Sequence, residues 1–341
     1  MKLIASLILF SIIILLNSCI PDETPVKPHL KGGVKVGTVA MGNLYTNQVY
    51  FNLELDSVVA SNLVTDWDLA FASNPDSIVA FIVNGGCFMS VYNTGKTRFE
   101  DVSPSDTNGL DASLWNYDNP KGNLDSTAFG VWWESKTPTQ IISKSEVYII
   151  NRGVTDRGKS RGFKKFQILG YENGIYYIKF SDLNSNQANE IEIPRNPLYN
   201  FIHFSFNNNG AIVTIEPTTN QWDLCFTKYT ELLYTNDGQA MWYSVTGPLL
   251  NPNRVSVAIA DTSMSFDNIT YDYAKNLTYS NNINSIGHEW KWFDLGQGFY
   301  IINNKKVYII QTPVAYYKLH FTDFYNTSGE KGYPKFEFQK L

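Results

Sequence analysis

The sequence predicts an all-β protein with two tandem antiparallel β-sheet domains of sandwich-like type. Two observations support this prediction. First, short runs in which apolar and polar residues alternate with a period of two follow one another along the 341-residue chain. Second, the same short motifs occur twice in the same order, which indicates an internal duplication. Amphipathic helical periods are absent from the sequence.

Short strands are expected where aromatic and β-branched residues alternate with polar ones. The clearest runs are Val49–Leu55, Ile175–Phe180, Phe201–Phe206, Tyr316–Phe321 and Lys335–Gln339. Turn signals rich in Asn and Gly separate the runs, for example at 207–210 and 236–238. Many short strands with tight turns are typical of antiparallel sheets.

Four motifs of the first half recur in the second half at a nearly constant spacing. Their two copies begin at Val49 and Phe201, at Trp67 and Trp222, at Val147 and Val307, and at Tyr176 and Tyr316. The Trp-Asp-Leu-x-Phe copies are 155 residues apart (222 − 67), and the Val-Tyr-Ile-Ile copies are 160 apart (307 − 147). A period of this length indicates a duplicated domain. We therefore expect a first domain at residues 35–195 and a second at 196–341.

The Trp-Asp-Leu-x-Phe motif is expected to be structural. Its Trp, Leu and Phe lie at positions that can share one core, with Trp as a large anchor. Asp68 and Asp223 would turn the other way and accept hydrogen bonds from backbone amides at a strand edge. The sequence shows no partner acid for either carboxylate, and a catalytic acid would need one.

The first half contains a longer segment after its Val-Tyr-Ile-Ile motif than the second half does. The extra segment holds six basic residues: Arg152, Arg157, Lys159, Arg161, Lys164 and Lys165. We expect an added hairpin with a basic tip. Two interpretations stay open, namely a solvated loop and a docking site for anionic groups.

The N-terminus has the features of a bacterial lipoprotein signal. Lys2 precedes an apolar run, and Leu16-Asn-Ser-Cys19 resembles the lipobox, which predicts a signal peptide at 1–18 and lipidation of Cys19. Several acyl chains on Cys19 would anchor the protein to the outer membrane, at the cell surface. Residues 19–34 are rich in Pro and Gly and form the expected tether. The alternative is an ordinary signal peptide followed by an incidental cysteine.

Composition narrows the possible partners and activities. Charged residues make up 17% of the chain and the net charge is −5, which gives no support for a nucleic-acid partner. The sequence contains no phosphate-binding loop, zinc-site spacing or nucleophile elbow, so we predict no catalytic residue, no protein-bound metal site and no enzyme activity. Cys87 and Cys225 would form one disulfide or stay as two buried free thiols.

Two stretches of the second half are similar to a known family. The stretch from Phe204 to Phe226 and the C-terminal stretch from Val307 to Phe338 resemble the HmuY-like family of haem-binding surface lipoproteins. The resemblance covers 199–341 well and 45–185 more weakly. It implies an all-β fold and the capture of haem, either free or from a haem-carrying protein. It also implies delivery to an outer-membrane receptor without turnover.

The resemblance also implies where ligands would lie. Family members hold haem iron between two His or Met side chains on loops between the Trp-Asp-Leu-x-Phe motif and the late Val-Tyr-Ile-Ile strand. Here that stretch is 227–306, and its candidate axial ligands are His288, Met241 and Met264. Trp290 and Trp292 would stack on a flat ligand or belong to the core. His203 and His320 lie in alternating runs and are expected to be structural.

A second function fits the same composition. Exposed Trp and Tyr side chains stack on sugars as well as on porphyrins. The alternative prediction is therefore a surface lipoprotein that binds a glycan or a protein and does not bind haem.

Overall fold

Antiparallel strands make up nearly all of the regular structure. A computed structural model describes residues 30–137 and 139–341, and in this part the strands are arranged in five sheets with a single short α-helix. The prediction of an all-β protein is confirmed. The predicted signal peptide and Cys19 lie outside the described residues, as does most of the predicted tether. Within the described ranges, no helix has the length and apolar character that crossing a membrane requires.

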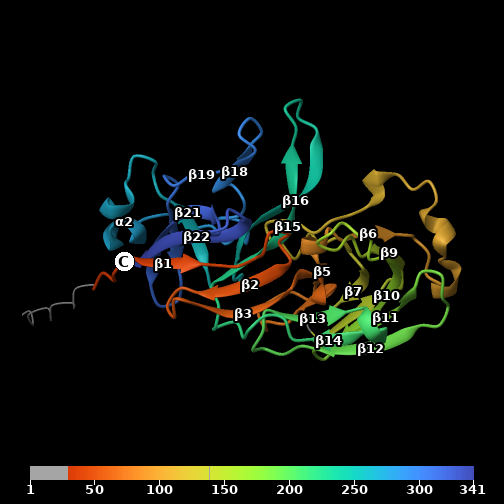
Figure 1. Cartoon of the computed structure of the whole chain (residues 1–341). Helices are drawn as coiled ribbons and strands as arrows, with labels where there is room; N and C mark the ends of the chain where they lie inside the picture. The colour runs from red at the N-terminus through yellow and green to blue at the C-terminus, as the bar shows by residue number, and fades with distance from the viewer. Residues whose placement is uncertain (1–29, 138) are drawn as a thin grey trace, which may run out of the picture. The chain divides into compact units, whose positions relative to one another are not determined.

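The two larger sheets lie in different parts of the molecule, at the left and at the right of Figure 1. The five-stranded sheet has the order β1 (Lys35–Thr38), β22 (Lys331–Lys340), β21 (Tyr316–Tyr325), β20 (Tyr308–Gln311) and β17 (Ser256–Ile259). The seven-stranded sheet contains β12 (Asn189–Pro194), β11 (Ile175–Asp182), β10 (Phe163–Glu172), β8 (Gln140–Ser143) and β7 (Trp133–Lys136), with β9 (Val147–Asn151) pairing to β10 and to β6 (Ser90–Asn93).

Two four-stranded sheets and one hairpin complete the strands. One sheet has the order β14 (Ala211–Val213), β13 (Phe201–Ser205), β4 (Leu69–Ala72) and β5 (Phe81–Val83). The other has the order β16 (Ala240–Leu250), β15 (Leu224–Tyr234), β2 (Asn47–Asn52) and β3 (Ser57–Leu63). The hairpin pairs β18 (Lys291–Asp294) with β19 (Phe299–Ile302).

Helical segments are short. Helix α2 spans Tyr271–Lys275, and the Thr270 hydroxyl caps it by accepting a hydrogen bond from the Tyr273 amide. The 3-10 turns are Val64–Asp66, Gly85–Cys87, Phe99–Asp101, Pro104–Thr107, Ala112–Leu114, Asn207–Asn209 and Phe266–Asn268.

The two copies of the duplicated sequence exchange strands. Strand β2, from the first copy, pairs with β15 of the second copy and places Phe51 opposite Leu224. Strand β13, from the second copy, pairs with β4 of the first and places Phe204 opposite Leu69. The two registers are equivalent. The first repeated strand of each copy, β2 or β13, is called here its first strand, and it pairs with the Trp-Asp-Leu-x-Phe strand of the other copy. The predicted boundary between 195 and 196 lies between β12 and β13 and stays a prediction.

Two main cores follow from this exchange. One core joins the seven-stranded sheet to the β4–β13 sheet and includes Leu69, Phe71 and Phe204. The other joins the five-stranded sheet to the β2–β15 sheet and includes Phe51 and Phe226. Because side chains alternate across a strand, each four-stranded sheet also has a second apolar face.

The second faces of the two four-stranded sheets meet in a third cluster. Trp67 and Ala70 from the first copy lie there, together with Trp222 and Cys225 from the second. The expectation that Trp, Leu and Phe of each motif share one core is therefore wrong. Trp precedes the strand and turns to the contact between the copies, while Leu and Phe face the core of their own half.

Both remaining cysteines are buried free thiols. Cys87 lies in the core of the first half and Cys225 lies in the cluster between the copies. Of the two alternatives left open by the sequence, the structure has the free thiols.

Candidate ligand-binding cleft

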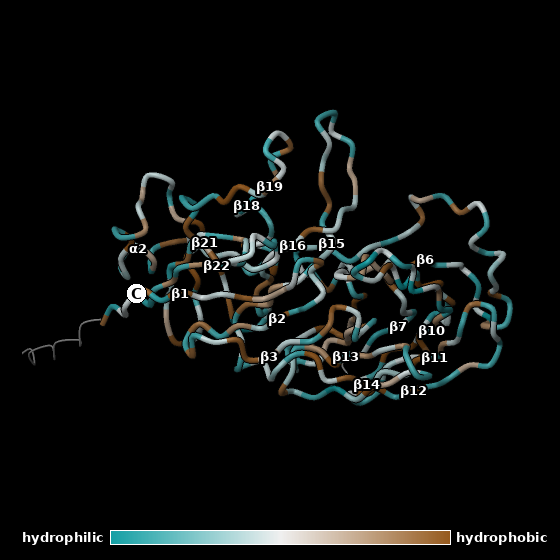
Figure 2. Tube along the Cα trace, viewed as in Figure 1, coloured by the Kyte–Doolittle hydropathy of each residue, from teal (hydrophilic) through white to brown (hydrophobic). Residues whose placement is uncertain are grey.

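A cleft of about 700 Å³ lies between two hairpins. The β15–β16 hairpin and the β18–β19 hairpin project on the same side of the molecule (Figure 1), and side chains from both line the cleft. The tip of the β15–β16 hairpin is hydrophilic (Figure 2), whereas its strands contribute Leu233, Tyr243 and Val245 to the cleft. Aromatic residues of the lining are Tyr45, Tyr243, Trp292, Phe293 and Tyr300, and its basic residues are Lys228, Lys291 and Lys331.

His288 reaches the cleft because two backbone segments approach very closely. A Cβ atom at Gly247 on β16 would lie 1.8 Å from the carbonyl oxygen of Gly287. Gly287 itself has a φ of +56°, a left-handed conformation that glycine adopts without strain. Its amide donates to the Pro248 carbonyl at 3.3 Å. These two glycines therefore place His288 beside β16.

The imidazole of His288 has one nitrogen in contact with protein and one open. The Tyr229 hydroxyl lies 3.3 Å from Nδ1. Within residues 30–137 and 139–341, Nε2 makes no hydrogen bond. Burial lowers the pKa of His288 below its ordinary value, so the ring is neutral at pH 7 and Nε2 can act as a donor to a metal centre.

Lys291 lies at the base of the cleft and is almost fully buried. Its ammonium donates to the Thr246 carbonyl at 2.6 Å and lies 4.4 Å from the centroid of the Trp290 ring. Burial lowers the pKa of Lys291 to about 7 and also lowers the pKa of Lys228. A carboxylate that entered the cleft would favour the charged form of both amines, because opposite charges stabilise each other.

The structure separates the predicted ligand-stacking residues. Trp292 is half-exposed on β18 and lines the cleft, as does its neighbour Phe293. Trp290 is fully buried and stacks on Phe321 with ring centroids 4.0 Å apart. Trp290 thus lies in the core, one residue before β18 begins.

The two candidate methionines lie in different places. Met241 is half-exposed on β16, opposite Leu233, which lines the cleft. Met264 packs against the cluster around α2, together with Phe266. His288 and Trp292 therefore line the same cleft, whereas neither Met241 nor Met264 belongs to its lining.

His320 has a full set of structural contacts. Its Nδ1 lies 2.9 Å from the Asn304 carbonyl oxygen and its Nε2 lies 3.1 Å from Glu337, and the ring stacks on Phe266. His203 is buried between the copies and lies edge-on to Trp67 at 4.9 Å. Neither imidazole lines the cleft.

Several residues of the cleft could not be identified from the sequence. Tyr45 comes from the first copy, Lys228 follows the Trp-Asp-Leu-x-Phe motif on β15, and Tyr243 and Tyr300 come from strands that carry no motif. The available signal was the aromatic content of 239–300, which did not show which side chains point outward. Among the described residues, no group of three or more His, Cys, Asp or Glu side chains is close enough to hold a metal ion.

The chain matches the model of one known protein family. The family model described as HmuY protein matches the chain twice, at residues 44–190 and 171–338. The chain belongs to the HmuY family. The two matches agree with two tandem units, and the predicted resemblance is confirmed. No curated protein matches the chain.

Solved structures of two proteins with HmuY-like names and of one putative lipoprotein are similar to this HmuY-family chain at low identity. A putative HmuY-like heme binding protein from Bacteroides vulgatus is 10% identical, covers 89% of this chain and 90% of its own, and has a TM-score of 0.23. An apo HmuY analog from Tannerella forsythia is 11% identical, with coverages of 93% and 99% and a TM-score of 0.24. A putative lipoprotein from Bacteroides fragilis is 13% identical, with coverages of 49% and 89% and a TM-score of 0.20.

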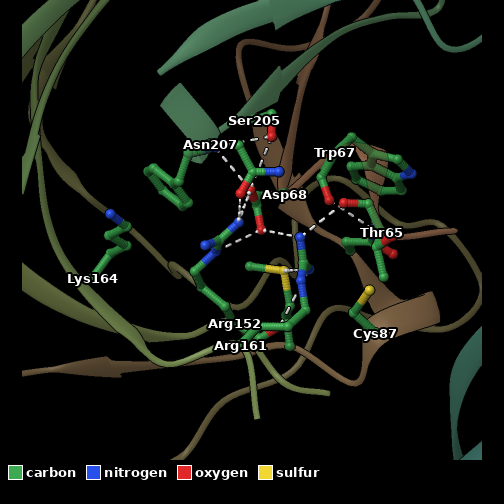
Figure 3. A network of polar contacts seen from close by, with 12 residues as sticks. Thr65, Trp67, Asp68, Cys87, Arg152, Arg161, Lys164, Ser205 and Asn207 are labelled. Carbon is green, nitrogen blue, oxygen red and sulfur yellow. Dashed lines mark hydrogen bonds and ion pairs between the residues drawn. The ribbon is translucent and has the colours of Figure 1, made fainter. Parts of the chain in front are cut away.

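Two arginines of the basic hairpin of this HmuY-family chain bind the Asp68 carboxylate of the Trp-Asp-Leu-x-Phe motif (Figure 3). Arg152 donates two hydrogen bonds to the buried Asp68 carboxylate, from Nε at 3.0 Å and from Nη2 at 2.8 Å. Arg161 Nη2 lies 3.0 Å from the same carboxylate, and the Phe206 amide donates to it at 2.8 Å. The predicted amide bond to Asp68 is present, but two arginines add to it.

Four of the six basic residues in this segment have protein partners. Arg152 and Arg161 bind Asp68, Lys164 pairs with Asp182, and the buried Lys165 donates to the carbonyls of Phe99 and Val102. Arg157 and Lys159 at the tip are exposed. The segment is therefore mainly a structural hairpin with a solvated tip.

Proposed function

We propose that this HmuY-family protein is a surface lipoprotein that binds haem in the cleft between the β15–β16 and β18–β19 hairpins, without turnover. Family membership and one observation support the proposal. The observation is that His288, whose Nε2 makes no hydrogen bond in the described residues and whose pKa is lowered by burial, lines a cleft that also holds half-exposed aromatic rings and lysines.

Several side chains of the lining suit the groups of haem, and the lining also contains the carboxylates Asp156 and Glu289. Haem iron takes an imidazole nitrogen, and His288 offers one. The flat porphyrin face needs apolar contact, which Trp292 and Phe293 supply. The two carboxylates need cations, and Lys228 and Lys331 lie in the same lining. Met241 is the proposed second axial ligand, because its cross-strand neighbour Leu233 lines the cleft.

Titration with haemin tests the proposal. Wild-type protein should give an intense, sharpened Soret band, and His288→Ala should shift the band and weaken binding about 10- to 100-fold. His320→Ala is the matched control, because that imidazole is held by Asn304 and Glu337 and should leave the spectrum unchanged. An unchanged spectrum and affinity for His288→Ala would remove His288 as an iron ligand.

The same titration should depend on pH in two defined directions. A protonated imidazole cannot bind iron, and burial lowers the pKa of His288 from its ordinary value of 6.5. Protonation of His288 should therefore weaken binding only as the pH drops below 6.5. Loss of the Lys291 charge, whose pKa burial lowers to about 7, should weaken binding of the haem carboxylates as the pH rises above that value.

Membrane attachment is the second part of the proposal. Because Cys19 follows a lipobox-like sequence, Cys19→Ala should remain an unlipidated precursor and lose the membrane attachment that acyl chains provide. Labelling with palmitate and membrane fractionation measure this. A Cys19→Ala protein that still carries the label would contradict the lipoprotein proposal, and the proposed delivery of haem to an outer-membrane receptor would lose its basis.

One observation favours a second candidate function. The β18–β19 hairpin exposes Trp292, Phe293, Leu295 and Phe299, a surface that also suits a glycan or a protein. If haemin produces no Soret change, Trp292→Ala should be tested for loss of glycan or protein binding.

A further inference from the structure

A separate cavity of about 350 Å³ lies between the two four-stranded sheets. Each sheet comes from an exchanged pair of strands, so the cavity is formed where the two copies of the duplication face each other. Ligand sites occur preferentially at such interfaces between domains, and this volume falls in their usual range. The cavity lining does not include His288.

Equivalent positions of the two copies line the cavity with different side chains. Trp67 and Trp222 occupy the same motif position, and both contribute to the lining. In the strands that pair with the motif, His203 on β13 takes the place that Tyr50 has on β2. Aromatic rings from both copies therefore form the walls, and the polar groups differ between them.

Two polar groups in these walls lack partners. His203 is 6% exposed, and among the described residues its ring makes aromatic contacts but no hydrogen bond. The indole N–H of Trp222 is buried and also has no partner in the described part of the chain. The equivalent N–H of Trp67, in contrast, donates to Gln48 at 3.2 Å. Because buried polar groups are normally paired, Trp222 and His203 are two residues of the lining whose hydrogen-bonding capacity is unused within the described chain.

Tyr50, Trp67 and Trp222 form the aromatic end of the cavity. The titratable side chains beside these rings carry no charge at neutral pH. Burial lowers the pKa of His203 to about 3 and raises the pKa of Glu216 to about 8, so both side chains are neutral. Glu216 is held by the Phe201 amide at 2.7 Å. The lining also contains Asp118, whose pKa burial raises to about 7 and which already accepts from the amides of Val83 and Ala128. Lys228, further along β15, is a cation whose pKa burial lowers. A charged ligand at the aromatic end would lose its hydration without gaining an opposite charge.

We propose that the cavity between the two copies is a second ligand site, which takes an uncharged planar aromatic molecule with a hydroxyl or ring N–H at its edge. A hydroxyl can accept from Trp222 and donate to His203, and the flat ring packs against Trp67 and Tyr50. The site is distinct from the proposed haem cleft, but Lys228 belongs to both linings, and Tyr229 of the cavity lining contacts His288.

Binding of 5-hydroxyindole to the full chain tests the proposal. Calorimetry should detect binding at probe concentrations up to about 1 mM. In the nitrogen–proton spectrum of tryptophan side chains, the Trp222 peak, identified by its absence in Trp222→Phe, should shift. 5-Hydroxyindole-3-acetate has the same ring with a carboxylate and should bind at least about tenfold more weakly. Failure of the Trp222 peak to shift in wild-type protein would overturn the proposal.

Two variants locate the probe. Ala70→Leu fills the cavity from β4 and should abolish binding, and His203→Phe keeps a ring but removes the hydrogen bond, so binding should weaken about five- to tenfold. His288→Ala should bind the probe like wild type and separates this site from the haem cleft. If Ala70→Leu does not fold, the wild-type peak shift and His203→Phe decide. Folded Ala70→Leu that binds the probe normally would place the probe elsewhere and refute the site.

Discussion

Asp68→Asn should lower the free energy of unfolding by about 3–5 kcal/mol, the loss expected when one partner of a buried ion pair is removed. Asp68 is fully buried, and it is the only carboxylate that binds Arg152 and Arg161 among the described residues. The substitution keeps the shape of the side chain but leaves two guanidinium groups in a low-dielectric site without a counter-charge. Chemical denaturation at constant pH measures the change.

Asp182→Asn is the matched control for this prediction. Asp182 also pairs with a basic residue of the same hairpin, Lys164, but its side chain is 66% exposed. An exposed pair contributes about 0–1 kcal/mol, so the control should unfold almost like wild type. If Asp68→Asn loses no more stability than Asp182→Asn, the buried network does not stabilise the fold.

This network shows where the sequence was informative and where it was not. The motif repeat predicted a structural Asp68 with an amide partner, and the structure has that amide at Phe206. The basic segment that begins 84 positions further along, at Arg152, predicted a hairpin whose tip was either solvated or a docking site for anionic groups. The sequence could not show that Arg152 and Arg161 are buried, because their counter-ion lies in a distant strand.

The strand exchange could not be predicted from the motifs. Each copy supplies a similar first strand and a similar Trp-Asp-Leu-x-Phe strand, so either first strand fits either partner by its apolar pattern. Alternation identified the strands, but identical alternation in two copies leaves the choice of partner open. That choice is made by three-dimensional packing.

The cleft was only partly predictable, because residue type and local pattern do not show which side chains face it. His288 was found because it is the single histidine of 227–306, and Trp292 was found with it. Trp290 has the same residue type and lies two positions away, yet it is fully buried because it precedes the strand. Tyr45 and Lys331 reach the cleft from both ends of the described chain, and no local pattern marks them.

Phe51→Ala should cost about 3–5 kcal/mol of stability, and the damage should appear in the other half of the sequence. Phe51 is 2% exposed and packs edge-on against Phe336 at 5.2 Å and Phe338 at 5.9 Å. Its loss leaves a void among strands β20–β22, where native-state hydrogen exchange should become faster. Each 1.4 kcal/mol lost by that core corresponds to about a tenfold faster exchange through opening.

Phe204→Ala is the reciprocal variant and provides the control. Phe204 belongs to the second half of the sequence, but it packs edge-on against Phe180 at 5.4 Å and lies in the core of the first half. Its loss should speed exchange in β9–β11 and leave β20–β22 better protected than in Phe51→Ala. The two variants thus predict crossed effects, because each copy lends its first strand to the core of the other. Uncrossed effects, in which Phe51→Ala loosens β9–β11 and spares β20–β22, would show that each copy keeps its own first strand in solution.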